Sequence, residues 1–190
     1  MFTRYTRRSL AVALFLVAAA LGSAGAVNAS AAARPYCGIT WGSLPKVNDV
    51  HSSAALTDIR TGQHDCYDRV VFDFDSPGTG YKVDYADQVY SEGKGQPLSP
   101  AGGARLNVVL LENAYDVQTG ASTYPHQVGD HVANVSGYRT LRDVVYGGTF
   151  EGYTTIGLGV RARLPFRVFT LAGPGEHGRI VIDVAHRWSQ

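Results

Sequence analysis

One short stretch of the sequence brings together residues that could carry out acid–base chemistry. His64, Asp65 and Asp68 lie close together in the chain, directly before Arg69. A histidine oriented by a carboxylate can activate a nucleophile, and the two side-chain types also bind metal ions. Aspartates are equally typical of turns, where they bond to their own backbone, and Arg69 could pair with Asp68. The segment favours a structural role, with ligand contact and catalysis as alternatives.

A second group of such residues consists of His126, Asp130 and His131. Their spacing would present two metal ligands on one face of a helix, but Pro125 and Gly129 argue against a helix here. A zinc site also needs a further, well-spaced ligand, which the neighbouring sequence does not provide. We therefore expect neither a metal ion nor another cofactor.

Sequence motifs of well-known hydrolases are absent: the chain contains neither G-x-S-x-G nor H-E-x-x-H. Asp183 lies in an apolar run, and we expect it to face solvent or to pair with Arg167. The few glutamates lie near turns, and nothing selects two of them as a glycosidase pair. No catalytic residue is therefore assigned.

Aromatic residues make up 11% of the chain, and their faces could stack against sugar rings. Trp41 precedes the first expected strand, where it caps the core or forms a platform. Tyr81 and Tyr85 are predicted to face the core, because charged residues occupy the opposite face, whereas Tyr115 and Tyr124 are predicted to be exposed. The ligand-binding candidates are Trp41, His64, Asp68, Arg69, Tyr115, Tyr124 and His126.

Short apolar runs separated by Gly and Pro predict a chain of strands to position these residues. Val70, Phe72 and Phe74 alternate with more polar residues, as in a half-buried strand. Gly157 and Gly159 leave one strand face bare, which indicates close approach by another backbone or a bend. The expected strands cover residues 55–61, 69–74, 81–85, 106–111, 153–160, 166–171 and 179–184, while 141–146 could be strand or helix. About seven or eight short strands predict an all-β single domain, a β-sandwich or a small barrel.

Residues 112–138 interrupt this rhythm with a long polar segment that has no clean period. A connection of this length in a compact domain is usually functional or mobile. It carries Tyr115, Tyr124, His126 and His131. The segment is a binding loop or an indifferent insertion, and both interpretations stay open at this point.

The N-terminal residues have the features of an export signal. Arginines at 4, 7 and 8 precede an apolar run at 10–21 and small residues at 29–33, the order of a secretory signal peptide. An uncleaved anchor is the alternative, and the Arg pair also resembles a twin-arginine signal. We expect a signal peptide at 1–33 and one domain at 34–190, with no membrane span after cleavage and no cysteine for a lipid anchor at the end of the apolar run.

The composition excludes two classes of protein. A formal net charge of +1 argues against nucleic-acid binding, and 45% hydrophobic residues argue against disorder. The only two cysteines, Cys37 and Cys66, form an even pair in an exported chain, which predicts a disulfide. Two unpaired thiols are the alternative.

Four segments together resemble the AMIN-like domain of exported proteins and lipoproteins from Gram-positive bacteria. They are CGITWGS at 37–43, GQHDCYDRVVF at 62–72, FEGY at 150–153 leading to GLG at 157–159, and PFRVF at 165–169. The resemblance covers roughly residues 37–186 and is most specific at Gly62, His64, Asp68 and Arg69. It implies a β-sandwich outside the membrane. Through the related AMIN module of periplasmic amidases and secretion machinery, it also implies noncatalytic binding in the envelope.

These observations lead to one main hypothesis and two alternatives. The main hypothesis is a secreted or wall-associated, noncatalytic binding domain that recognises cell-envelope glycan or an envelope protein. A small secreted hydrolase that uses the His64/Asp65/Asp68 turn is the first alternative. An extracellular inhibitor or scaffold that meets its partner through residues 112–138 is the second. The oligomeric state stays open.

Overall fold

The computed structural model describes residues 36–78 and 80–188, and the expected signal peptide at 1–33 lies outside them. No helix in this part of the chain has the length and apolar character needed to cross a membrane. The elements are a short 3-10 turn, η1 (Tyr36–Gly38), and the strands β1 (Lys46–Asn48), β2 (Leu56–Gln63), β3 (Tyr67–Phe74), β4 (Tyr81–Ala86), β5 (Val89–Tyr90), β6 (Pro97–Leu98), β7 (Ala104–Leu110), β8 (Leu141–Phe150), β9 (Tyr153–Val160), β10 (Phe166–Ala172) and β11 (Gly178–Ala185).

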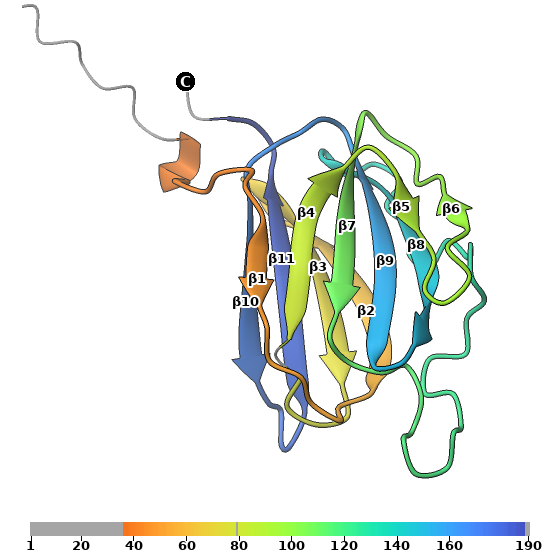
Figure 1. Cartoon of the computed structure of the whole chain (residues 1–190). Helices are drawn as coiled ribbons and strands as arrows, with labels where there is room; N and C mark the ends of the chain where they lie inside the picture. Colours follow the sequence, from red (N-terminus) through yellow and green to blue (C-terminus); the bar gives the residue numbers. More distant parts are fainter. Residues whose placement is uncertain (1–35, 79, 189–190) are drawn as a thin grey trace, which may run out of the picture. The chain divides into compact units, whose positions relative to one another are not determined.

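The strands form two antiparallel sheets that face each other (Figure 1). One sheet has the order β1-β4-β7-β9-β8, the other has the order β10-β11-β3-β2, and β5 pairs with β6 in a separate hairpin. The predicted all-β sandwich is therefore confirmed, with more strands than the seven or eight expected. The ambiguous segment at 141–146 is part of β8.

The core between the sheets follows the alternation seen in the sequence. Val70, Phe72 and Phe74 of β3 are fully buried and pack with apolar residues of β4, β7, β9 and β11. Burial of each such side chain contributes about 1.5–3 kcal/mol. Tyr81 and Tyr85 pack against this core as predicted.

The glycines of β9 have the role that their spacing predicted. A Cβ on Gly159 would overlap the carbonyl oxygen of Ala101, and one on Gly157 would lie 3.2 Å from Pro100 Cγ. The chain after β6 therefore crosses the outer face of β9 in close backbone contact. This crossing holds the β5–β6 hairpin beside β8, where Val89, Leu98 and Val145 form a small second cluster.

The predicted disulfide is present between Cys37 and Cys66. It joins the N-terminal segment to the connection between β2 and β3. Phe166 N–H donates to the Gly42 carbonyl oxygen at 3.0 Å, which fixes the same segment beside the start of β10. The disulfide and this hydrogen bond therefore hold Trp41, which lies between them in sequence, against the four-stranded sheet.

Candidate functional site

A cavity of about 650 Å³ lies where the β5–β6 turn, residues 114–128 and the end of β8 meet. Three of the ligand-binding candidates, Tyr115, Tyr124 and His126, line it. We call this cavity the aromatic pocket. The side chains that give it its character are the aromatic rings of Tyr115, Tyr124, His126, Tyr146 and Phe150 and the polar groups of Ser91, Glu92, Lys94, Gln96, Ser122 and Thr149.

The long segment 112–138 is anchored to the edge of β8 by backbone hydrogen bonds. Gly129 N–H donates to the Tyr146 carbonyl at 2.8 Å, and Tyr146 N–H donates to the Asp130 carbonyl at 2.9 Å. Val132 N–H donates to the Val144 carbonyl at 2.9 Å. The segment therefore extends the five-stranded sheet locally and carries the pocket residues to its edge.

A tight turn shapes the outer part of the same segment. The carboxylate of Asp116 accepts hydrogen bonds from the backbone N–H groups of Gln118 and Thr119, both at 2.8 Å. These bonds, with Thr119 as the larger cause, lower the pKa of Asp116. An isolated bridge between Tyr115 and Ser122 closes the turn. The segment is thus organised by its own polar groups and forms one wall of the pocket.

Tyr124 forms the inner part of the pocket and is only 5% exposed. Its ring lies 4.4 Å from that of His126 and 5.4 Å from that of Tyr146, measured between centroids. Burial raises the pKa of Tyr146 to about 12 and that of Tyr124 also well above its usual value, so both phenols are neutral at physiological pH. The prediction that Tyr124 is exposed was wrong. Thr123, its neighbour, donates to the Leu56 carbonyl and draws the chain against β2.

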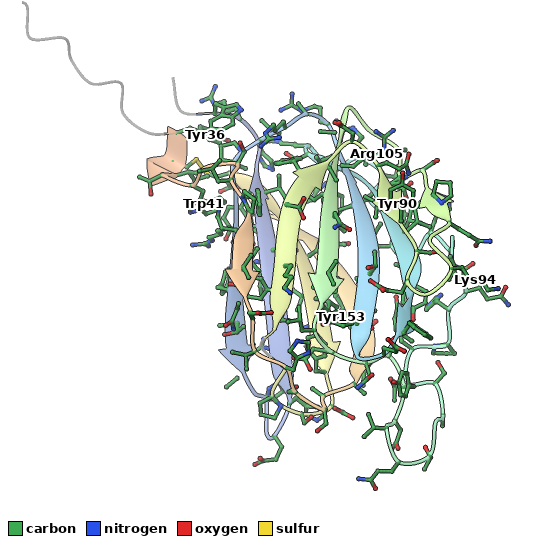
Figure 2. The ribbon with its side chains drawn as sticks, in the orientation of Figure 1. Tyr36, Trp41, Tyr90, Lys94, Arg105 and Tyr153 are labelled. Atoms are coloured by element: carbon green, nitrogen blue, oxygen red, sulfur yellow. A yellow bond between two sulfur atoms is a disulfide. The ribbon has the colours of Figure 1, made fainter. Side chains whose placement is uncertain are left out.

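The outer part of the pocket exposes apolar surface next to charged groups. The Phe150 side chain is 51% exposed, and a Cβ on Gly93 would lie 3.3 Å from its ring. Gly93 also has a φ of +68°, so glycine suits this position on both counts. Figure 2 shows Lys94 at the β5–β6 hairpin, on the opposite side of the view from Trp41.

The arrangement suits recognition of a ligand that has both apolar faces and polar edges. Cavities of this size with aromatic walls and a few polar groups are typical of small-molecule sites. The His126 ring nitrogen Nδ1 lies 3.5 Å from the Asp130 carboxylate, but no hydroxyl of a described residue is hydrogen bonded to that ring. His131 pairs instead with Asp143 at 2.7 Å. The three residues of the predicted second cluster are therefore divided between two places.

The predicted acid–base cluster at the β2–β3 connection has a different structure. Asp68 is fully buried on the inner side of β3, and its Oδ2 accepts from the backbone N–H groups of Thr140 and Leu141 at 2.6 and 2.9 Å. Its Oδ1 lies 3.0 Å from Nε2 of His186. Asp68 therefore ties β3 to the start of β8 and to the end of β11, as a structural carboxylate.

Arg69 does not form the pair with Asp68 that the sequence allowed, because adjacent strand residues point to opposite faces. It donates from Nε and Nη2 to both carboxylate oxygens of Asp183, at 2.6 and 2.9 Å. Asp183 is fully buried and also accepts from Arg167 at 2.8 Å. The pairing with Arg167 was predicted, whereas the solvent-facing alternative for Asp183 was wrong.

The remaining ligand-binding candidates, His64 and Trp41, lie at the end of the four-stranded sheet that carries the β2–β3 connection. His64 is exposed and stacks on Tyr67 at 4.5 Å, and it shares a cavity of about 240 Å³ with Asp65, Asp68 and His186. Trp41 is half-buried on the outer face of the sheet, where the Arg167 guanidinium lies 4.4 Å from its ring centroid. Figure 2 places Trp41 beside the N-terminal segment, away from the aromatic pocket.

Sequence reasoning missed two contacts, that of His186 with Asp68 and that of Arg69 with Asp183. His186 is 118 residues from Asp68, so no local pattern links them. Arg69 and Asp183 are opposite one another in the register of β3 and β11, which becomes visible only once those two strands are paired. Among the described residues, no group of three or more potential metal ligands occurs.

Comparison with known proteins assigns the chain to a family. No curated protein and no solved structure matches the chain. The model of the AMIN-like domain matches residues 54–186, which include β2 to β11, the aromatic pocket and Asp68. Because this match covers more than half of the sequence, the chain belongs to the AMIN-like domain family.

Proposed function

We propose that this protein is an exported, noncatalytic binding domain that holds a cell-envelope glycan in the aromatic pocket. The observation that carries the proposal is the pocket itself, which gathers Tyr115, Tyr124 and His126 on one cavity of about 650 Å³. Membership of the AMIN-like family supports an envelope-associated binding role. The basic, apolar and small segments of residues 1–33 support export.

The chemistry of the pocket favours a sugar over a purely apolar ligand. Aromatic faces carry negative charge density and attract the C–H groups on the flat side of a pyranose ring. Tyr115 and Phe150 offer such surface at the open side of the pocket. Lys94 and Gln96 supply donors for the groups at the ring edge. Glu92 supplies an acceptor through its second carboxylate oxygen, since the first accepts from the Thr155 hydroxyl at 2.6 Å.

Hydrolysis at the His64/Asp65/Asp68 turn is the less supported function. Both oxygens of Asp68 already accept hydrogen bonds from the protein, and Arg69 lies on the other face of the sheet. A His64→Ala variant tests it directly with ester, glycan and peptide substrates. Activity that the wild type has and His64→Ala lacks would replace the binding proposal by the enzymatic one.

Sedimentation with purified cell walls tests the binding proposal. We expect the wild-type protein to co-sediment well above a serum-albumin control. Tyr115→Ala combined with Phe150→Ala should weaken binding at least about fivefold, the effect of losing side chains at the centre of a contact. Tyr90→Ala is the matched control, because Tyr90 is 55% exposed, lies in the β5–β6 hairpin and does not line the pocket. Equal binding by both variants would reject the pocket as the site.

The same experiment separates a glycan from a protein partner. Walls stripped of protein should retain the wild-type protein if the ligand is glycan. Binding that disappears with the wall proteins would instead favour the inhibitor or scaffold hypothesis. N-terminal sequencing of the exported protein tests processing, and we expect the mature chain to begin at residue 34.

A further inference from the structure

Strand β10 is the outermost strand of the four-stranded sheet, at the left margin of Figure 1. It is seven residues long, and its last three residues, 170–172, are exposed. Leu171 is 39% exposed although its side chain is large and apolar. An open edge of this length offers its backbone groups to a further strand.

Two hydrogen bonds show which backbone groups of β10 point away from the sheet. Ala185 N–H donates to the Pro165 carbonyl at 2.9 Å, so the odd-numbered residues that follow Pro165 bond to β11. Phe166 N–H donates in the other direction, to the Gly42 carbonyl at 3.0 Å. Because these directions alternate along a strand, the even-numbered residues of β10 direct their N–H and C=O groups outwards.

The outward groups after Phe166 belong to Val168, Thr170 and Ala172. Their N–H groups form no hydrogen bond within the described part of the chain, and the same holds for the carbonyls of Val168 and Thr170. The Ala172 carbonyl accepts from Arg179 Nη2 at 3.3 Å and has a second lone pair for another donor. The edge therefore has a regular row of donors and acceptors.

The other edges of the two main sheets are protected against such pairing. β8 is covered by residues 129–132, which bond to its backbone, and β1 has only three residues. β2 has an irregular register after Leu56 and carries the charged residues Asp58 and Arg60. Natural sheets block their edges with these devices. β10 keeps a regular register with β11, and its single charged residue, Arg167, lies away from the exposed end.

The sequence of β10 is complementary to a second copy of itself. In an antiparallel pair centred on Thr170, this residue lies opposite Thr170 of the second copy, and Val168 lies opposite Ala172. Each of these pairs exchanges both of its N–H···O=C hydrogen bonds. Phe169 lies opposite Leu171 on the outer face, an aromatic–aliphatic contact of the kind that stabilises sheets. No charged residue faces another in this register.

The N-terminal segment excludes the neighbouring register. A pair centred on Phe169 would bring Ala172 of the second copy opposite Phe166, where Gly42 already occupies the edge. Centring on Thr170 moves the second strand away from Gly42 and uses the exposed end of β10.

Pairing also brings together apolar surface from the facing sheet. The two-fold axis of an antiparallel pair is perpendicular to the sheet, so the five-stranded sheets of both copies lie on the same side. β1 lies beside β10, since the Lys46 ammonium is 4.7 Å from the centroid of the Phe166 ring. Val47 and Val50, in and just after β1, are more than half exposed. Their approach to the second copy removes apolar surface from water.

We propose that two copies of this protein pair through β10 and join their four-stranded sheets into one continuous antiparallel sheet. The aromatic pocket lies beside β8, at the opposite edge of the five-stranded sheet from β1, so pairing leaves it open. The dimer therefore presents two pockets. This pairing does not depend on the glycan proposed for them.

Sedimentation velocity over a range of protein concentrations tests the pairing. We expect the wild-type protein to form a reversible dimer. Thr170→Pro removes an outward N–H without breaking a bond between β10 and β11, so the dissociation constant should rise at least about thirtyfold, the effect of two lost hydrogen bonds. Thr170→Ala keeps the N–H and is the matched control, with a change below about fivefold. Thermal unfolding verifies that both variants are folded.

Cysteine cross-linking tests the register. In a mixture of Phe169→Cys and Leu171→Cys proteins, the two new cysteines lie opposite one another with Cα atoms about 4.5 Å apart, within reach of a disulfide. Either variant alone places its two cysteines on a diagonal about 7–8 Å apart, beyond that reach. After mild oxidation, a non-reducing gel should show a covalent dimer from the mixture and little from either variant alone.

Three results would overturn the proposal. One is a wild-type protein that stays monomeric at every concentration, which would leave a strand of another protein as the occupant of this edge. Another is a Thr170→Pro protein that dimerises as well as Thr170→Ala. The third is cross-linking of the separate cysteine variants to the same extent as their mixture.

Discussion

The polar groups beside the β2–β3 connection and those of the aromatic pocket are in opposite states. At the connection, Asp68 is saturated by two backbone N–H groups and His186. In the pocket, the hydroxyl groups of Tyr124 and Tyr146 form no hydrogen bond with the described residues and are open to a ligand. A functional site is therefore identified less well by the chemical type of a side chain than by whether its hydrogen-bonding groups still lack a partner within the protein.

Removal of the Asp68 carboxylate should lower the free energy of unfolding more than the other changes to these two regions. Asp68→Ala leaves three buried donors without an acceptor, and we expect it to lower the free energy of unfolding by about 3–5 kcal/mol. Urea denaturation measures this loss. Asp65→Ala, at an exposed position in the same connection, should cost less than about 0.5 kcal/mol. Similar losses in the two variants would show that Asp68 is not the structural residue described above.

The disulfide should contribute slightly less than Asp68 to the free energy of unfolding. Cys37 and Cys66 are separated by 29 residues, and a closed loop of that length stabilises a fold by about 3.5 kcal/mol in the chain-entropy model. The double variant Cys37→Ser and Cys66→Ser should lose this amount in the same denaturation experiment, while wall binding by the folded fraction stays unchanged. A loss of wall binding at full stability would place the ligand at the disulfide end instead.

Alkaline pH probes the inner wall of the pocket. The pKa of Tyr146 is raised by burial to about 12, above the value of 10.0 expected for the unfolded chain. Between pH 10 and pH 12 the Tyr146 hydroxyl therefore keeps its proton in the folded state and loses it in the unfolded chain. Its contribution to the free energy of unfolding is present below pH 10 and is lost as the pH rises towards 12. Unfolding measured on both sides of pH 10 should show the decline, and Tyr146→Phe should reduce it. An equal decline in that variant would assign the effect to other groups.

Phe150→Ala should have only a small effect on the free energy of unfolding. Half of this side chain is already exposed, so its truncation should cost about 1 kcal/mol or less. Phe74→Ala, at a fully buried position, should cost about 3–5 kcal/mol and is the matched comparison. If thermal or urea unfolding gives a large loss for Phe150→Ala, the ring supports the fold and is not available as a binding surface.

The sequence predicts those parts of the fold in which neighbours along the chain determine the outcome. The strand expected at 153–160 has the bounds of β9, because alternation and paired glycines both mark it. β1, β5 and β6 have two or three residues each, too few to show a period. The disulfide followed from the number of cysteines and the expected export alone.

The site could be predicted only in part, for a related reason. The sequence marks residues 112–138 as a segment that could be a binding loop, and Tyr115 and His126 do line the pocket. The burial of Tyr124, however, depends on β2 and Tyr146, which lie far from it in sequence. The pocket also includes Phe150, which belongs to a strand and which nothing in the local pattern distinguishes from a core residue.

The sharing of Asp183 between two arginines has a consequence for how this domain tolerates mutation. If either Arg69 or Arg167 is replaced, the buried carboxylate keeps one cation, so each single change is mild. If both are replaced, an uncompensated charge is left in the sheet, and the combined cost exceeds the sum of the two. The domain should therefore tolerate replacement of either arginine, but not of both together.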